Sequence, residues 1–195
     1  GYGSYIFPAV APLIIHQTVL LGLCMLIGGY REKQWRASRA EFLAIYLVAL
    51  TIGTLGCLYL FGFTFWLNDY PRGGNFFGML CAVPIFISAV IGLAFFIASY
   101  LDTSERAGHL IVFSSVPLFL LSGTAWPLQA MPEWMQMFSQ LLPSTQGINL
   151  FVQLNQMGVS TQLILPKLIY LLFISLILLS LSWYRLGVFI KKIHK

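Results

Sequence analysis

The sequence is poor in charged residues. Only 9% of its 195 residues are Asp, Glu, Lys or Arg, whereas a soluble domain has about 25%. Apolar residues make up 58% of the chain, against roughly 45–50% in soluble domains. So few charges cannot cover the surface of a folded chain of this length in water. The composition excludes a soluble globular protein and indicates a membrane protein.

The sequence also lacks the motifs of several enzyme classes. It has no G-x-x-x-x-G-K-[ST] segment to hold nucleotide phosphates, no H-E-x-x-H zinc motif and no G-x-S-x-G elbow. The cysteines Cys24, Cys57 and Cys81 stand alone in apolar runs, without the spacing of a metal site or a disulfide framework. We therefore expect no catalytic residue, no metal site and no cofactor bound by this chain.

Carboxylates are missing from the middle of every apolar run. The carboxylates all lie in polar loops or at the ends of the runs: Glu32, Glu41, Asp69, Asp102, Glu105 and Glu133. A proton-coupled pump normally needs such a group within the membrane, so this placement argues against one. If the chain takes part in transport, the energy must come from a partner.

Five apolar runs are long enough to cross a bilayer. Each has about 17 residues or more with almost no charge, close to the length that spans the hydrocarbon core. The runs cover residues 6–30, 42–67, 76–101, 110–126 and 163–190. The sequence therefore predicts one all-α transmembrane domain over residues 1–195, a polytopic bundle of five membrane-spanning helices.

The basic residues indicate how this bundle is oriented. Most of them fall in alternate loops: Arg31, Lys33, Arg36, Arg39, Arg106, Arg185, Lys191, Lys192 and Lys195. The positive-inside rule places these loops and the C-terminus in the cytoplasm of a plasma membrane, with the bacterial inner membrane as the expected one. The net charge of +5 follows from this topology, and we expect no nucleic-acid partner.

The N-terminus would then lie outside the cell. An odd number of crossings that starts outside is unusual for a complete protein, and the chain begins at Gly1 rather than Met. We therefore expect a further span and an external domain before residue 1.

One segment leaves the lipid and turns back towards it, over residues 127–158. Between Pro132 and Leu142, apolar side chains fall on one helix face and Glu133, Gln136, Ser139 and Gln140 on the other. Eleven residues make a helix of roughly 16 Å, too short to cross a bilayer. A second short helix, capped by Ser144, is expected to end near Gly158. The pattern predicts a re-entrant hairpin of two short helices at the outer face.

Polar side chains also occur in the middle of the first span, at His16, Gln17 and Thr18. Polar groups at this depth are costly in lipid, so they should face other helices or a wet cavity. Both interhelical hydrogen bonding and a role in a substrate path remain open.

The loop over residues 31–41 is short and mixed in charge. It contains no Pro or Gly, and Glu32 and Arg36 stand four apart, as in a helical ion pair. We predict a cytoplasmic helix over these residues. With Trp35 it either rests on lipid headgroups or serves as the contact for a cytoplasmic partner.

Several motifs resemble one family of membrane proteins. The segments Leu121-Ser-Gly-Thr-Ala-Trp-Pro127, Met131-Pro-Glu-Trp134 and Leu142-Pro-Ser-Thr145, followed by Gly158, are similar to the C-terminal part of ABC type-2 transporter permeases. The segment from Pro8 to Leu21 is similar to the second span of that family. Residues 99–107 fall where its second cytoplasmic loop lies, so the likeness covers nearly all of the chain.

The resemblance implies a function and partners. The chain would be the membrane subunit of an exporter of amphiphilic molecules such as drugs or lipids. It would work as a homo- or heterodimer with a second permease copy, in contact with membrane lipid. ATP-binding cassette ATPase subunits would bind underneath and hold the ATP and Mg. Residues 31–41 would be the coupling helix, although the family's Arg-Glu-Arg-x-x-Gly-Thr is here Arg31-Glu-Lys-Gln-Trp-Arg36.

Three sets of site residues follow from this hypothesis. The ATPase-contact set is Arg31, Glu32, Lys33, Trp35 and Arg36. The translocation-path set is His16, Gln17 and Thr18. The outer-gate set is Trp126, Pro127, Met131, Pro132, Trp134, Met137 and Phe138.

Two other functions stay open at this point. A membrane-embedded enzyme acting on lipid would need an acidic or histidine cluster near one interface, and Asp102, Glu105 and His109 form the candidate. An assembly subunit that transports nothing would need no polar site at all.

Overall fold

The computed structural model describes residues 3–188, and the predictions that concern residues 1–2 and 189–195, among them Lys191, Lys192 and Lys195, lie outside this range. Every regular element in the described range is a helix. In chain order they are α1 Gly3–Glu32, α2 Arg39–Cys57, η1 Leu58–Thr64, α3 Phe65–Leu67, α4 Phe76–Ala98, α5 Ser104–Leu121, η2 Leu128–Ala130, α6 Glu133–Leu141, α7 Pro143–Phe151, η3 Val152–Gln156, α8 Thr161–Trp183 and η4 Tyr184–Val188.

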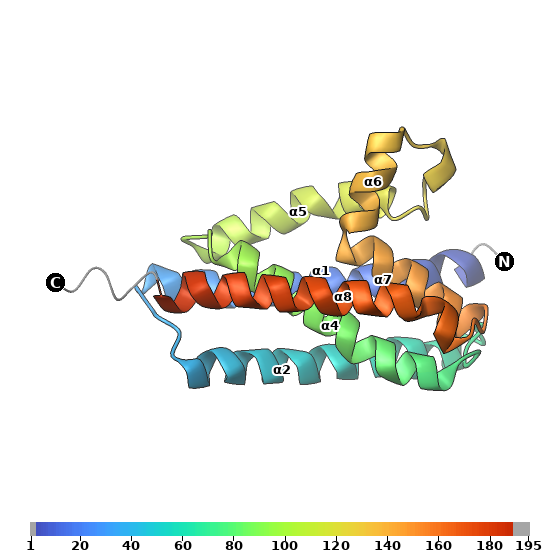
Figure 1. The fold of residues 1–195 in the computed structure, drawn as a ribbon, viewed down its shortest axis with the longest axis horizontal. Coiled ribbons are helices and arrows are strands. Elements are labelled where there is room, and N and C mark those ends of the chain that lie inside the picture. The colour runs from blue at the N-terminus through green and yellow to red at the C-terminus, as the bar shows by residue number, and fades with distance from the viewer. Residues whose placement is uncertain (1–2, 189–195) are drawn as a thin grey trace.

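The long helices form an elongated bundle (Figure 1). Helices α1, α4 and α8 run along its length, with α2 on one side and α5 on the other. Helix α6 stands crosswise beyond the far end of α5, and α7 leads from it back to the bundle. The predicted all-α membrane bundle is therefore confirmed.

Within the described residues, four helices rather than five are long and apolar enough to cross a membrane. They cover Ile6–Glu32, Arg39–Leu67, Phe76–Ala98 and Thr161–Leu186. The predicted fifth span, residues 110–126, corresponds to α5, which begins at Ser104 and ends at Leu121. Only residues 110–121 of that run are helical, because α5 ends at Leu121, so its apolar part is shorter than the sequence run indicated. Four of the five predicted spans are therefore found by length and composition, and the crossing of α5 stays a prediction.

Helix α4 is the core of the bundle. It packs against α1, α2 and α8, and Phe86, Ile87, Val90 and Ile91 are completely buried. Two glycines let its neighbours approach closely. A Cβ added at Gly53 of α2 would lie 2.7 Å from the Ile87 side chain, and one at Gly92 would lie 3.2 Å from the backbone of α8. The apolar residues on the outer faces of α2 and α8 remain exposed, as expected for helices in lipid.

The helix predicted over residues 31–41 does not form. Helix α1 ends at Glu32, Gln34 adopts a left-handed conformation with φ of 56°, and α2 starts at Arg39. Ser38 caps α2: its hydroxyl accepts a hydrogen bond from the Glu41 amide, and the Glu41 carboxylate accepts one from the Ser38 amide. This capping box starts a new helix at Arg39, within the range 31–41 that was predicted to be one continuous helix.

The region of the predicted hairpin, residues 127–158, contains α6 and α7 and the short elements η2 and η3. Pro143 occupies the first turn of α7, and Leu142 rather than Ser144 is its N-cap. The Ser144 hydroxyl is buried and makes no hydrogen bond among the described residues, so the expected Ser144 cap was wrong. A proline in the first turn lacks only an amide that would have had no helical partner there.

Two loops meet at the far end of the bundle in what we call the glycine junction, between residues 73–75 and 154–161. The Gly73 amide donates to the Asn155 side chain at 2.7 Å, and the Asn75 amide donates to the Leu154 carbonyl at 2.9 Å. The Asn75 side chain donates to the Val159 carbonyl at 2.8 Å. The α2–α4 and α7–α8 connections are thereby fixed to each other.

We predict that Gly74→Ala destabilises this junction. A Cβ at Gly74 would lie 2.6 Å from the Gly158 Cα, and backbone atoms cannot move away as a flexible side chain does. The expected cost is about 1–3 kcal/mol in thermal unfolding of the detergent-solubilised protein. Gly56→Ala is the control, because a Cβ there meets nothing within 4 Å. Equal melting temperatures for the two variants would contradict the close approach.

Candidate functional site: the basic end of the bundle

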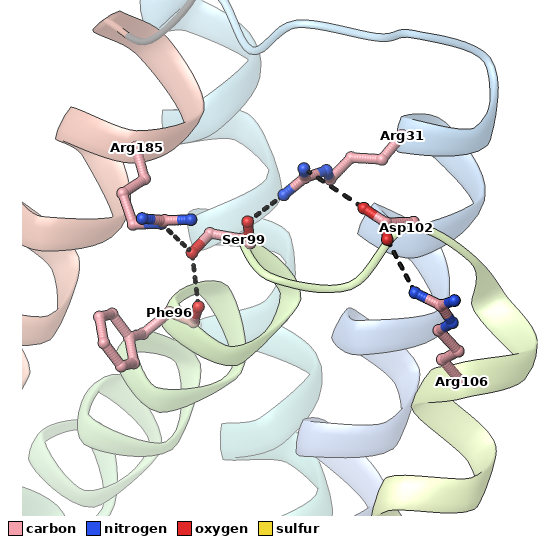
Figure 2. Close-up of polar contacts among 6 residues, drawn as sticks. All are labelled: Arg31, Phe96, Ser99, Asp102, Arg106 and Arg185. Carbon is pink, nitrogen blue, oxygen red and sulfur yellow. Dashed lines mark hydrogen bonds and ion pairs between the residues drawn. The ribbon is translucent and has the colours of Figure 1, made fainter.

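Basic residues gather at one end of the bundle, which we call the basic end. It comprises the end of α1 with loop 33–38, the α4–α5 loop at residues 99–103, and the end of α8 with η4. The α1–α2 loop, the α4–α5 loop and the end of α8 lie at the same end in Figure 1, opposite the glycine junction. Arg31, Arg106 and Arg185 approach one another there from three different elements (Figure 2).

Ser99 is the centre of this arrangement. It is the C-cap of α4 and is 1% exposed. Its carbonyl accepts a hydrogen bond from Arg31, and its hydroxyl donates to the Phe96 carbonyl at 2.6 Å (Figure 2). Because the carbonyls at a helix C-terminus carry partial negative charge, a guanidinium is favourable at this position.

Arg185 holds the other side of Ser99. Its Nε donates to the Ser99 hydroxyl at 3.1 Å, and its guanidinium lies 3.7 Å from the centre of the Tyr100 ring. A cation over an aromatic face contributes roughly 0.5–2 kcal/mol, depending on how far it is removed from water. Two arginines from α1 and η4 therefore enclose the end of α4.

Asp102 connects the α4–α5 loop to α1 and α5. It lies 3.8 Å from Arg31 and 2.8 Å from Arg106, which is four residues further along the chain. The Asp102 and Arg106 side chains are both 64% exposed, so water screens this pair and it contributes at most about 1 kcal/mol. These ion pairs orient the loop more than they stabilise the fold.

Helix α1 also touches the start of α5 directly. The Glu32 carboxylate accepts a hydrogen bond from the Ser104 amide at 2.8 Å. A Cβ added at Gly28 would lie 2.8 Å from the Thr103 carbonyl oxygen, so only glycine permits this backbone approach. The carboxylate stands at the positive end of the α5 dipole, where it is favourable.

The contacts join α1, α4, α5 and η4 at a single point around residues 99–104. The ends of these helices are hydrogen-bonded or packed backbone to backbone, and loop 33–38 follows directly on the end of α1. Packed helices move as rigid elements more readily than they unravel within a membrane. The basic end has the geometry of a mechanical junction between a surface loop and the bundle.

A family model described as "ABC-2 type transporter" matches residues 27–155, about two thirds of the chain. The chain belongs to the ABC-2 type transporter family. Helices α1, α4 and α5 and the hairpin contribute to the matched region, which also includes the Arg31–Asp102–Arg106 contacts. The family resemblance seen in the sequence motifs is confirmed, and the chain is the membrane part of a transporter.

Two curated relatives of this ABC-2 chain are longer proteins. ABC transporter G family member 20 of Dictyostelium discoideum is 29% identical over 149 residues, which is 71% of this chain and 19% of the relative. Linearmycin resistance permease protein LnrN of Bacillus subtilis (strain 168) is 31% identical over 110 residues, 54% of this chain and 28% of the relative. The chain thus spans under a third of either relative's length. No solved structure matches it.

The residues predicted to contact an ATPase divide into two groups in this ABC-2 chain. Arg31 and Glu32 point at residues 99–104, as described above. Lys33 and Arg36 are exposed, and Trp35 is half-buried with its ring 4.9 Å from that of Tyr30. The Trp35 indole also donates to Glu41 at 3.4 Å. The structure thus separates a connecting pair, Arg31 and Glu32, from the loop residues Lys33, Trp35 and Arg36.

The three path residues point in different directions. His16 is buried beside Phe86, and neither ring nitrogen has a hydrogen-bond partner among the described residues. Gln17 donates to Ser115 of α5 at 2.8 Å. Thr18 is exposed and lines a groove of about 540 Å³ between α1 and α2. Within this chain the three do not surround one cavity.

The outer-gate residues lie mostly on the exposed face of α6. Trp134, Met137 and Phe138 are more than half exposed, whereas the polar Ser139 is fully buried. Met131 is also buried, Trp126 is half-buried, and Pro127 and Pro132 are exposed. The helix therefore turns its apolar side away from the rest of this chain, and its polar side towards it.

The acidic cluster considered for a lipid enzyme does not assemble. Asp102 is paired with two arginines, while Glu105 and His109 are exposed on α5. Among residues 3–188, no group of three or more His, Cys, Asp or Glu side chains is placed to hold a metal ion.

The sequence analysis did not foresee Ser99 or Arg185 as members of the site. Asp102 and Arg106 have the i, i+4 spacing of a helical ion pair, a signal that was available. Ser99 is one of several serines in the chain, and its importance comes from the approach of α1 and η4. No local pattern indicates that approach.

Proposed function

We propose that this chain is the permease part of an ATP-driven exporter, which moves drug-like or lipid-like amphiphiles out of the cytoplasm or the inner leaflet. ATP-binding cassette ATPases would dock on the basic end and supply the ATP and Mg. The basic end would face the cytoplasm of a plasma membrane, which in a bacterium is the inner membrane. The positive-inside rule supports this orientation.

The observation that carries the proposal is the junction around Ser99. A transporter without its own energy source must receive motion from a partner, and Arg31 with Glu32 links the exposed loop to α4, α5 and η4. Nucleotide-driven movement at loop 33–38 would then shift these helices together. Alternating access needs such rigid-body movement of packed helices.

Export of an amphiphile is supported by two further facts. One relative carries the name linearmycin resistance permease protein, which connects a permease with resistance to a compound. The described part of the chain also presents broad apolar surfaces and no acidic cluster within its spans. Such surfaces suit substrates that partition into lipid.

A second permease copy would lie against α5 and α6. Val112, Phe113 and Val116 on α5 are 64–78% exposed, and the apolar face of α6 continues this surface. Exposed apolar area of this kind is covered by lipid or by another protein. A path between two copies would also explain why the path residues of one copy do not enclose a cavity.

For docking itself we propose Lys33, Trp35 and Arg36, with Arg31 and Glu32 transmitting the motion. The double variant Lys33→Glu/Arg36→Glu should weaken association with the ATPase at least about tenfold in co-purification of the full complex, since two attractive charges become repulsive. Arg72→Glu, a reversal at the opposite end of the bundle, is the control. If the double variant retained the ATPase as well as the control does, docking at this loop would be wrong.

The export itself is tested with the complete transporter in lipid vesicles. We expect ATP-dependent movement of a fluorescent amphiphile into vesicles whose transporters face inside out, and none with a non-hydrolysable ATP analogue. Movement of the amphiphile without ATP, or without the ATPase subunits of the transporter, would contradict the proposal.

A further inference from the structure

A second feature of the bundle is an apolar cavity far from the basic end. It has a volume of about 580 Å³ and lies between α2 with η1 and the first half of α4, next to the glycine junction. Its walls are mostly apolar, with Cys57, Leu58, Phe61, Met79, Leu80 and Val83 among the lining residues. This volume lies in the range of sites that bind small organic molecules.

The helix that forms one wall of the cavity is irregular. Helix α2 passes into the π-helix η1 over Leu58–Thr64, and π-helical turns in longer helices frequently accompany functional sites. Gly62 lies in this stretch and lines the cavity, and a Cβ added there would meet nothing within 4 Å. The space next to it is open. The lining residues Leu58 and Leu80 are more than half exposed, so the cavity opens sideways to the surrounding lipid.

Three polar side chains line the otherwise apolar cavity: Thr54, Arg72 and Asn155. Arg72 donates to the Tyr70 carbonyl at 3.2 Å and more weakly to the Phe65 carbonyl at 3.4 Å. Its ion-pair partner Asp69 is 3.6 Å away and fully exposed to water, so this pair leaves most of the arginine's charge uncompensated. The other basic residue near this end, Lys167, donates to Gln153 instead.

Asn155 is another polar residue that lines the cavity. It is 5% exposed, and its side-chain oxygen is occupied by the Gly73 amide. Its side-chain nitrogen is buried and has no hydrogen-bond partner among residues 3–188. An unmet buried donor costs roughly 1–3 kcal/mol, and because this nitrogen has almost no accessible surface, the cavity does not reach it in this structure.

We propose that this cavity binds one anionic phospholipid from the leaflet that surrounds this end of the bundle. Its phosphate would lie against Arg72, and one acyl chain would extend along Phe61 and Leu80. Charge complementarity at Arg72 and the apolar walls favour a molecule with both an anion and a hydrocarbon chain. The site is separate from the transported substrate, and the inference does not depend on the export proposal.

Lipid binding to the complete transporter in detergent tests this site by native mass spectrometry. The probes are phosphatidylglycerol, diacylglycerol with the same acyl chains, and inorganic phosphate. Arg72→Gln removes the charge, Arg72→Lys keeps it, and Leu80→Trp fills the cavity. Leu165→Trp is the matched control, because Leu165 is likewise half exposed on a long helix but does not line the cavity.

We expect one saturable phosphatidylglycerol per chain, with diacylglycerol at least about tenfold weaker and inorganic phosphate without measurable binding. Arg72→Gln should weaken phosphatidylglycerol about tenfold, Arg72→Lys less, and Leu80→Trp should abolish the site while Leu165→Trp leaves it unchanged. Each variant must melt like the wild type, and a variant that does not is replaced by Arg72→Met or Leu80→Phe.

Three results would overturn the inference. Equal binding of diacylglycerol and phosphatidylglycerol would show that Arg72 does not bind the phosphate. Unchanged binding in Leu80→Trp would place the lipid elsewhere. No saturable lipid site, together with a changed oligomeric state in Leu80→Trp, would show that another protein segment fills the cavity. None of these outcomes bears on ATPase docking or export.

Discussion

Gly28→Ala is expected to disrupt transport although it adds a single methyl group. The new Cβ would lie 2.8 Å from the Thr103 carbonyl oxygen and 3.2 Å from the Ser104 amide nitrogen, both backbone atoms. Helix α1 and the start of α5 must separate, which weakens the hydrogen bond from Ser104 to Glu32. Overpacking of this kind costs about 1–3 kcal/mol. We expect ATP-driven transport to fall at least about tenfold in vesicles.

Gly29→Ala is the matched control for this variant. It lies on the same helix one residue later, and its Cβ would meet only the Ser104 Cβ at 4.0 Å, an ordinary contact. Alanine is favoured over glycine within a helix by about 1 kcal/mol, so this variant should be as stable as the wild type or more so. Similar loss in both variants would show that the two glycines matter for helix flexibility and not for the contact with Thr103.

Arg31→Ala is expected to uncouple ATP hydrolysis from transport. The change removes the hydrogen bond to the Ser99 carbonyl and the weaker pairing with Asp102, so α1 loses its link to the end of α4. The ATPase should still bind, because the proposed docking residues Lys33 and Arg36 are intact. We expect transport per ATP hydrolysed to fall about tenfold or more. Parallel measurement of both rates in vesicles checks this.

Two companion variants sharpen the Arg31 experiment. Arg31→Lys keeps the charge but loses the planar fork that reaches Ser99 and Asp102 together, so it should restore coupling only in part. Asp102→Ala removes exposed, screened ion pairs and should reduce transport less than threefold. A larger loss in Asp102→Ala than in Arg31→Ala would contradict the assignment of Ser99 as the centre of the junction.

The composition of the chain was sufficient to predict a helical membrane bundle. Long uncharged runs are stable in lipid, and there a helix satisfies all the backbone hydrogen bonds of the run. The exact extent of the helices was harder to predict. Helix α5 begins earlier than its apolar run, since Thr103 caps it before Glu105 and Arg106. The break at residues 33–38 could have been predicted from the Ser38-x-x-Glu41 capping box, which the sequence analysis passed over.

The candidate site depended on information that the sequence does not carry locally. The charged residues of the first loop were named, but Arg31 meets Ser99 across 68 residues of chain, and Arg185 meets it across 86. Likewise, the amphipathic pattern predicted a helix after Pro132 but not its direction. In helix α6, Trp134 and Met137 are exposed, whereas Ser139 is buried against the rest of the chain.

Imaging of the purified complex with its ATPase by electron microscopy tests the central claim most directly. The account predicts that ATPase density lies against loop 33–38 and the α4–α5 loop, at the end of the bundle where Arg31 meets Ser99. ATPase density at the end that carries Gly73 and Arg72, or an active complex with no density at the basic end, would contradict it.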